Sequence, residues 1–436
     1  MSLRTPTLLV LALLAPRPGD AAPLSLDRAI QLALAHNELA RAADERRLAS
    51  DARVTRARAY FFPNLVGTAS YSRRSTEVTR QLGTEPVTLL RLHGLQATVT
   101  LSQTLFDPRS YPLYRQALED RKATRSSSEH QKRLLRFETA QAFLSTLTLE
   151  WVVQSAGRRL ALARQNLADA RARYGAQLSS SNDVTKAELE SAIAERELTR
   201  ARASVATARL QLGHLLNTEV SDALEVPEPL LALASAKVAS SQKLVEEARR
   251  QRLDLRASEG QLRALRAFAS EPLLRVLPSL VFSGQVKATN EPGFVGKYVD
   301  WSLGLSLSWT LFDGGVWYGE WKERRAQTRA AEAETEARSR QVALDVRRAL
   351  VEIENAQAAS RLAQVAVDAA AKNARETAAL YRQGLASALE NADASTRLFD
   401  AEVNFARERY GLAIAYLNLR AALGHDPLPT VEERRS

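Results

Sequence analysis

The chain has 436 residues, of which 45% are hydrophobic and 25% are charged, with 60 lysines and arginines against 50 aspartates and glutamates. Because it contains no cysteine, disulfides, thiolate metal sites, cysteine nucleophiles and lipid attachment to a cysteine are excluded. The net charge of +10 permits binding to nucleic acid or acidic lipid but specifies neither. Only 6% of the residues are aromatic, and the many Ala, Leu, Arg and Glu residues are typical of long helices.

The N-terminus has the pattern of a secretory signal peptide. A short basic start precedes an apolar run at 7–15, and small residues follow, so cleavage is expected near Ala21 or Ala22. The alternative is a buried N-terminal helix, but Pro16 breaks the pattern at once. No later window offers 18 uncharged apolar residues, so no transmembrane helix is expected. We therefore expect residues 1–22 to be removed from an exported protein.

The rest of the chain contains an internal duplication, in which the same structural unit occurs twice. Matching landmarks recur in the same order at separations of 206 to 216 residues, which chance similarity between Ala-rich helices would not easily produce. The matched pairs are residues 37–39 and 253–255, 62–65 and 277–280, the Leu-Phe-Asp segments 105–107 and 311–313, and Tyr174 and Tyr381.

Each copy is predicted to contain a helix, a β-hairpin and a long helical hairpin. The first copy is placed at residues 23–226, the second at 227–426, and a polar tail at 427–436. Within the hairpins, polar loops containing Gly or Pro are expected at roughly residues 74–93 and 288–298. The apolar stripe that follows Ser25 predicts the first helix, over residues 25–61.

Strands are predicted where apolar and polar residues alternate, at 95–105 and 303–311, with partner strands at 65–71 and 280–286. Ten alternating residues suit a tilted strand that crosses an outer membrane. A soluble sheet with one wet face is the alternative. Four strands are too few to close a barrel, so other copies of the chain would have to supply the rest. The side chains predicted to face lipid are Leu95, Val99, Leu101, Leu303, Leu305, Leu307 and Trp309.

After each Phe-Asp, helical periodicity continues for about a hundred residues with heptad spacing, which predicts a coiled-coil seam. A helix from about Tyr114 to Tyr174 would be roughly 90 Å long, which suits a rod or a tube. The breaks at 174–184 and 381–391 are predicted to be turns at the end remote from the strands. Asn182 or Asp183 is expected to cap the helix after the first turn. The residues assigned to the two turns are Ser179, Asn182, Gly384 and Ser387.

Several segments together resemble the TolC family of outer-membrane efflux proteins. They are the start at 24–37, the Phe-Pro-Asn-Leu junction at 62–65, and the strand ends at 103–107 and 309–315. No single segment is specific, but their tandem order is, and the resemblance covers about residues 24–426.

The resemblance implies a mainly α fold with a small β part. Long antiparallel coiled-coil hairpins form an α-barrel, and each protomer contributes four strands to a trimeric transmembrane β-barrel. It implies a homotrimer in the outer membrane of a Gram-negative bacterium, in contact with outer-membrane lipid and extending into the periplasm. Its function would be passive export in a tripartite efflux or type I secretion system. Its partners would be a periplasmic adaptor and an inner-membrane transporter. It implies no enzyme activity and no cofactor.

In that family an aromatic, a basic and several acidic residues close the periplasmic aperture near the turns, and the turns themselves would dock the adaptor. A ring of carboxylates from three copies would also filter cations. This sequence has Ala386 where the basic residue is expected, and Gln177 where a Gly is usual. The alternative for the acids at 390 and 393 is an ordinary solvated helix start. By matching motifs, the constriction is placed at Asp183, Tyr381, Glu390 and Asp393.

Other classes of function are disfavoured. The five histidines are scattered without metalloprotease spacing, and no phosphate-binding loop accompanies Gly314 and Gly315, so no metal or nucleotide site is expected. Arginine-rich helix faces interleave with Glu and lack aromatic partners, which argues against nucleic acid. A periplasmic coiled-coil adaptor or a structural coiled coil remains the alternative. Neither of these proteins would need two apolar hairpins, so the tandem duplication argues against them. The transported substrate cannot be read from these residues.

Overall fold

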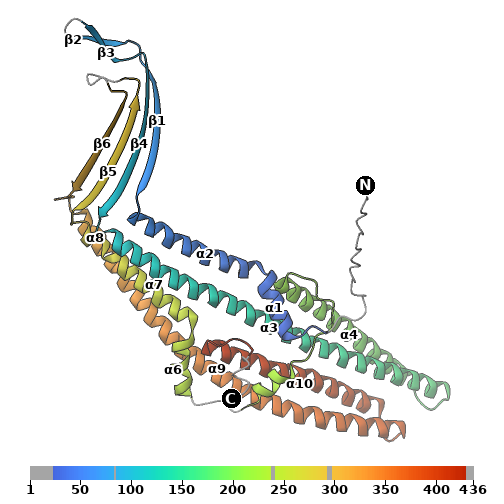
Figure 1. The fold of residues 1–436 in the computed structure, drawn as a ribbon. Coiled ribbons are helices and arrows are strands. Elements are labelled where there is room, and N and C mark those ends of the chain that lie inside the picture. The colour runs from blue at the N-terminus through green and yellow to red at the C-terminus, as the bar shows by residue number, and fades with distance from the viewer. Residues whose placement is uncertain (1–22, 83–84, 237–240, 292–296, 429–436) are drawn as a thin grey trace, which may run out of the picture.

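The computed structural model describes residues 23–82, 85–236, 241–291 and 297–428. The molecule is elongated, with a curved sheet at one end and long helices running away from it (Figure 1). The predicted signal peptide at 1–22 and all but the first two residues of the predicted tail lie outside the described residues. Within the described part, no helix is long and apolar enough to cross a membrane.

The helix predicted over residues 25–61 is divided. It forms α1 (Leu26–His36), α2 (Glu38–Arg58) and the short 3-10 helix η1 (Ala59–Phe61). Asn37 separates the first two, because its backbone is extended and its side chain accepts a hydrogen bond from the N–H of Leu39. The amide of Asn37 also donates to the carbonyl of Leu215, 3.0 Å away. The break is therefore set by a contact with a distant helix that periodicity cannot reveal.

Four antiparallel strands form the main sheet, in the order β1-β4-β5-β6. They are β1 (Asn64–Arg73), β4 (His93–Phe106), β5 (Ser279–Thr289) and β6 (Val299–Ser308). The pairing of β4 with β5 joins the hairpins of the two copies into one sheet.

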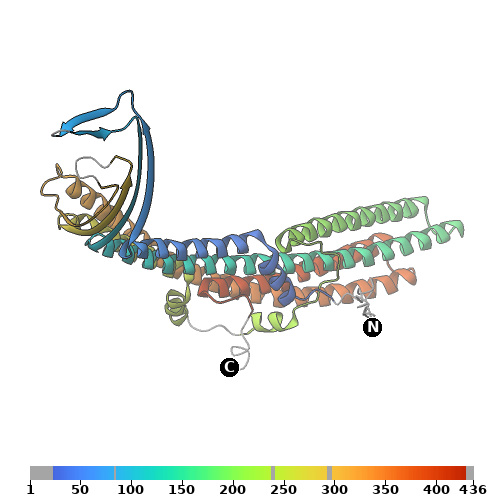
Figure 2. The ribbon, with the colours of Figure 1, turned by 45° about the horizontal axis from the view of Figure 1, so that its top comes forward.

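The strand prediction was wrong in two places. The strand expected over 303–311 ends at Ser308, and the indole N–H of Trp309 instead donates to the carbonyl of Val276. The loop expected at 74–93 contains β2 (Val78–Leu82) and β3 (Glu85–Leu90), which form a separate two-stranded sheet. Figures 1 and 2 show that this sheet projects from the end of β1 and β4 that is remote from the helices.

Two long helical hairpins account for most of the molecule. The first joins α3 (Ser110–Gly175) to α4 (Ser181–Leu216), and the second joins α9 (Val316–Arg382) to α10 (Ala388–Leu423). The 66 residues of α3 correspond to a length of about 100 Å. Figure 2 shows the two hairpins side by side, with their turns at the end remote from the sheet as predicted.

Shorter helices precede the second hairpin. They are α5 (Glu228–Ala234), α6 (Ser241–Gln251), α7 (Leu253–Ala269) and α8 (Glu271–Leu274). Arg252 separates α6 from α7 with an extended backbone, one residue before the position that the landmark match pairs with Asn37. The helix break is thus a repeated feature, although Asn37 caps the following helix with its side chain and Arg252 does not.

The core lies mainly where the helices of both copies meet. Its largest cluster joins Phe143 and Leu144 of α3 to Leu212 of α4 and Leu417 of α10, all of them fully buried. Toward the turns the packing narrows to a cluster of small and medium side chains between α3 and α4, which includes Ala156 and Ala194. Alanine at these positions permits the close approach of neighbouring helices.

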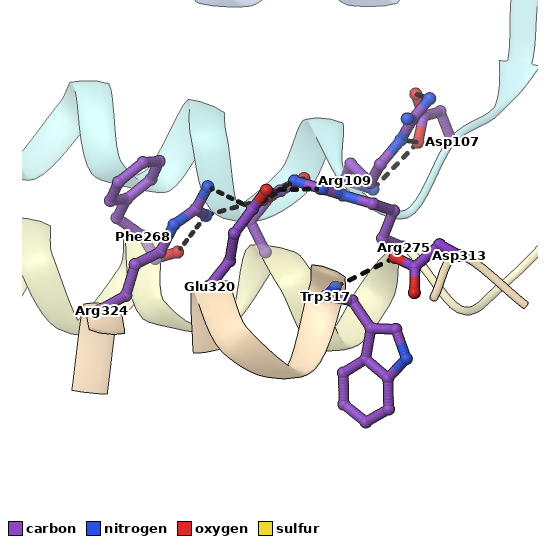
Figure 3. Close-up of polar contacts among 9 residues, drawn as sticks. Asp107, Arg109, Phe268, Arg275, Asp313, Trp317, Glu320 and Arg324 are labelled. Carbon is purple, nitrogen blue, oxygen red and sulfur yellow. Dashed lines mark hydrogen bonds and ion pairs between the residues drawn. The ribbon is translucent and has the colours of Figure 1, made fainter. Parts of the chain in front are cut away.

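Both Leu-Phe-Asp landmarks mark the start of a long helix. Asp107 accepts hydrogen bonds from the backbone and guanidinium of Arg109, just before α3. Asp313 accepts from the N–H groups of Gly315 and Trp317 at the start of α9. Figure 3 shows the bond from Trp317. A carboxylate satisfies backbone donors that have no partner within the helix, which explains why an acid recurs at this point.

A buried ionic network lies beside these starts. Glu271 is 5% exposed and pairs with Arg275 at 3.1 Å and Arg324 at 2.6 Å. Glu320 pairs with the same two arginines, and the Arg324 guanidinium lies 3.7 Å from the ring centroid of Phe268 (Figure 3). The network fastens α7 and α8 to the first turns of α9, next to the sheet.

The two hairpin turns have the same geometry but differ at one residue. Leu178 and Leu385 each donate a backbone hydrogen bond across the turn, to the carbonyls of Arg173 and Leu380. The position with positive φ is Gly384 in the second turn, at +77°, and Gln177 in the first, at +57°. A side chain in this left-handed region is strained, whereas glycine is not.

A reciprocal exchange tests this strain. Gln177→Gly is expected to stabilise the first turn, and Gly384→Gln to destabilise the second, each by about 1 kcal/mol. Hydrogen exchange of the turn amides should report these effects as slower and faster exchange, respectively. Equal protection in all three proteins would show that positive φ carries no cost at these turns.

Removing the buried carboxylate tests the ionic network. Glu271→Ala removes the buried one of the two carboxylates that Arg275 and Arg324 share, and is expected to cost about 3 kcal/mol, seen as a lower unfolding temperature. Glu332→Ala is the matched control. It removes an exposed pair between α9 and Arg266 of α7 and should cost less than about 1 kcal/mol. An equal loss in both variants would contradict a special role for burial.

Candidate functional site

One face of the main sheet is apolar and exposed. Side chains of directly paired residues share a face, and the register places Leu101 of β4 between Leu65 of β1 and Gly284 of β5. The leucines at 303, 305 and 307 of β6 are 65–68% exposed on this same face. It holds six of the seven residues predicted to face lipid: Leu95, Val99, Leu101, Leu303, Leu305 and Leu307.

The opposite face of the sheet is polar. Thr68 lies beside Thr98, and Ser283 lies between Ser102 and Gly304. The sheet therefore has one surface suited to hydrocarbon and one suited to water. Its edge strands, β1 and β6, have no further strand paired with their outer sides in the described chain.

Capping boxes at the hairpin turns start α4 and α10. In each, a serine hydroxyl accepts a hydrogen bond from the backbone N–H three residues later. The carboxylate of that later residue accepts in turn from the backbone N–H of the serine. The pairs are Ser180 with Asp183 and Ser387 with Glu390. The predicted N-cap of α4 was therefore wrong, because Ser180 caps it while Asn182 lies inside the first turn of the helix.

The other residues assigned to the turns lie between the helices. Ser387 is the N-cap of α10, and Gly384 supplies the positive φ just before it. Ser179 precedes the cap of α4, and its hydroxyl is buried without a hydrogen-bond partner.

The four residues assigned to the constriction lie at this same end of the molecule. Within one protomer, no hydrogen bond or ion pair recorded for the described chain joins any two of them. Asp183 and Glu390 serve the caps, and Asp393 pairs with Arg397 at 2.8 Å in an exposed position. Hydrogen bonds from the backbone N–H and the hydroxyl of Ser387 hold the pKa of Glu390 below its usual range. This carboxylate is therefore negatively charged at neutral pH.

Tyr381 differs from its counterpart in the first copy. It is 8% exposed, whereas Tyr174 is 52% exposed. The guanidinium of Arg173, from α3, lies 4.9 Å from the ring centroid of Tyr381 and donates to the Tyr381 carbonyl at 3.2 Å. Sequence reasoning missed Arg173, although its position two heptads after Arg159 on the same face of α3 was a usable signal.

Two further features lie near the turns. A cavity of about 190 Å³ lies between the hairpins. It is lined by residues of α3, α4 and α10 together with Tyr381. Leu178 and Leu385 are 79% and 72% exposed on the turns themselves. Across the described residues, no group of three or more His, Cys, Asp or Glu side chains is placed to hold a metal ion.

Comparison with known proteins shows the family. The sequence profile described as "Outer membrane efflux protein" matches residues 29–218 and 244–425. The chain is 27% identical over 383 residues to outer membrane protein TolC of Vibrio cholerae, which covers 85% of this chain and 84% of that protein. The exact limits predicted for the copies, 23–226 and 227–426, stay a prediction.

Solved structures have the same fold. The outer membrane protein VceC of Vibrio cholerae aligns with a TM-score of 0.75 at 17% identity, covering 92% of this chain and 97% of VceC. The CmeC outer membrane channel of Campylobacter jejuni aligns with a TM-score of 0.76 at 15% identity, covering 94% and 88%. The predicted fold class is confirmed: the chain is mainly helical, with long helical hairpins, a small four-stranded sheet and a tandem duplication.

The profile covers well over half of the chain in two successive matches, one to each copy. The chain therefore belongs to the outer membrane efflux protein family, whose members are channels rather than enzymes, and it resides in the outer membrane with a periplasmic extension.

Proposed function

We propose that three copies of this chain form a passive channel that serves as the exit duct of a tripartite efflux or type I secretion system. The observation that carries the proposal is the two-faced sheet, with unpaired edges, at the end of helices about 100 Å long. Hydrocarbon does not tolerate unpaired backbone groups, so β1 of one copy would pair with β6 of the next. The polar face would then line a water-filled passage.

The helices extend this passage into the periplasm. α3 and α9 continue directly from the sheet, so a barrel of strands from three copies would open into a tunnel of helices. Movement through such a tunnel needs no chemistry from the channel itself. We assign the energy input to an inner-membrane transporter.

The tips of the helical hairpins form the proposed gate. Threefold repetition would bring Asp183, Glu390 and Asp393 of each copy into rings of carboxylates at the periplasmic entrance. Such rings attract cations and hold back anions. Carboxylates are ionised at neutral pH even at their ordinary pKa, so these rings would be negatively charged there.

The tips also form the proposed docking surface for a periplasmic adaptor. Leu178 and Leu385 are exposed at matching positions of the two turns, where the chain offers no covering side chain. Exposed apolar groups gathered in one place are typical of protein interfaces. The assigned turn residues Ser179, Asn182, Gly384 and Ser387 flank these leucines and would surround the contact.

A charge placed on the apolar face tests membrane insertion. Leu305→Lys should cost about 2–4 kcal/mol and deplete the outer-membrane fraction of folded trimer. Ser306→Lys is the matched control, since the neighbouring residue points to the polar face and should be tolerated. Trimer recovery is read from urea-washed membranes. Normal recovery of Leu305→Lys would place this face outside lipid.

Planar bilayers test the acidic constriction. Glu390→Ala with Asp393→Ala should raise single-channel conductance or weaken block by multivalent cations, because the entrance loses most of its negative charge. Glu376→Ala, at an exposed position further up α9, serves as the control and should leave both unchanged. Currents and block identical to the wild type in the double variant would refute the gate assignment.

A further inference from the structure

The apolar face of the main sheet ends in two basic side chains at the end remote from the helices. On β1 and β4 the register pairs Tyr71 with Leu95 and, one row further from the helices, Arg73 with His93. Side chains alternate between the two faces along a strand, so this basic pair lies on the same face as the apolar pair. Both basic side chains are exposed. Since the helices extend into the periplasm, this end of the sheet is the one at the cell surface.

The length of the apolar face fits the hydrocarbon core of a membrane. On β4 it extends from Leu95 to Phe106, which is paired with Leu280 of β5. This stretch covers about 35 Å along the strand, or about 27 Å along the membrane normal at a tilt of about 40°. The lipid-facing band of outer-membrane barrels is about 25 Å tall. The row of Arg73 and His93 comes immediately beyond Leu95 and therefore lies at the level of the lipid headgroups.

Cations on the opposite, polar face have acidic partners. Arg74, the next residue along the chain from Arg73, forms an ion pair with Glu291. Lys287 of β5 is directly opposite Asp300 of β6. Opposite charges at such positions stabilise a sheet and largely cancel in the field that they produce. The polar face therefore has little net charge at this level.

Arg73 has no acidic partner in the described chain. No ion pair or hydrogen bond of its guanidinium is recorded there, in contrast to Arg74. His93 is held by Tyr71, whose hydroxyl lies 2.8 Å from Nδ1 and whose ring stacks on the imidazole with centroids 6.0 Å apart. With the hydroxyl as donor to Nδ1, the proton of a neutral imidazole is on Nε2 and can be donated outward. The pair therefore offers hydrogen-bond donors to an anion at the headgroup level.

The proposed trimer would bring a third basic side chain to this row. Closing the barrel places β6 of the neighbouring copy beside β1, with the cell-surface ends of the two strands together. Lys297 lies just before β6 and is exposed, and the adjacent Tyr298 is 54% exposed. Arg73 and His93 of one copy would then lie near Lys297 and Tyr298 of the next. Each seam between two copies would have one such group.

We propose that this basic row is a binding site for lipopolysaccharide, with the phosphates of its lipid A part at Arg73 and its acyl chains on the apolar face. The site rests on the proposed trimeric channel, because only a closed barrel brings Lys297 to the row. Arginine binds a phosphate through two parallel N–H donors, and such charge-assisted bonds are stronger than neutral ones. Tyr71 and Tyr298 lie where amphipathic rings favour the membrane interface.

The two parts of this surface together favour lipopolysaccharide over other anionic lipids. Lipid A combines phosphates at the headgroup level with several acyl chains, and it forms the outer leaflet of a Gram-negative outer membrane, which is the leaflet that this end of the sheet meets. The alternative is a general attraction of basic side chains to any anionic membrane surface, worth about 1 kcal/mol for each charge. A general attraction would depend on the number of charges and not on their place in the sheet.

Binding of lipid A to purified, lipid-depleted trimers tests the site. Native mass spectrometry should detect up to three lipid A molecules per trimer, one for each seam, bound more tightly than phosphatidylglycerol. Arg73→Gln should weaken lipid A binding by about tenfold, because it removes charge-assisted bonds to phosphate. Arg73→Lys should lose less, since it keeps the charge without the two parallel donors. Lipid A from which both phosphates have been removed should bind equally to the wild type and to Arg73→Gln.

Arg80→Gln is the matched control. It removes an exposed charge from β2, on the projecting sheet at the same end of the molecule, and should leave lipid A binding unchanged. Lys297→Gln should weaken binding, because it removes the charge that the neighbouring copy contributes at the seam. Thermal dissociation of the lipid-free trimers should be the same for all these variants, which separates loss of binding from loss of folding.

Several outcomes would overturn the site. An equal loss in Arg80→Gln would show general attraction to anionic lipid, and equal binding of phosphatidylglycerol would remove the preference for lipid A. Wild-type affinity in Arg73→Gln would exclude the basic row, and wild-type affinity in Lys297→Gln would exclude its place at the seam. A wild-type chain that forms neither trimers nor currents would refute the channel itself, whereas conducting trimers with no difference between wild type and Arg73→Gln refute only the lipid site.

Discussion

Backbone hydrogen bonding in hydrocarbon is the constraint on which the rest of the molecule depends. Four strands with one apolar face cannot satisfy their own edges, and no water is available in the bilayer to do so. In the proposed trimer, pairing with further copies would satisfy those edges and at the same time enclose the polar face. Closing the sheet in this way would create a passage, and the helices that continue from the strands would extend it.

The duplication gives both copies the same arrangement of helices and strands. Their sequences have diverged where the two copies contact each other. Capping boxes recur at Ser180 and Ser387, and a helix break recurs at Asn37 and Arg252, because each copy needs the same local geometry. The contact of Arg173 with Tyr381 has no counterpart. The features that recur in both copies thus shape each helical hairpin, whereas the contact of Arg173 with Tyr381 joins one hairpin to the other.

The strength of the polar contacts decreases along the molecule. Next to the sheet, Glu271 is buried between two arginines, so separating them would leave charges buried without partners. Midway along the hairpins, Arg159 is still paired with carboxylates. At the turns, contacts are exposed or involve neutral acceptors only. Stability in proteins is not uniform, and elements that move are drawn from its low end, which agrees with the proposed gate at the tips.

The sequence by itself determined the elements whose pattern is local: strands from alternation, long helices from heptads, turns from breaks in them, and the tandem order. It also placed the acids and Tyr381 at the tips. Only the tertiary structure decided the break at Asn37, the cap at Ser180, the sheet of β2 and β3, and the partner of Tyr381. Periodicity reports which side of a segment is buried, whereas these features depend on which distant atoms come within hydrogen-bonding or ring-contact distance.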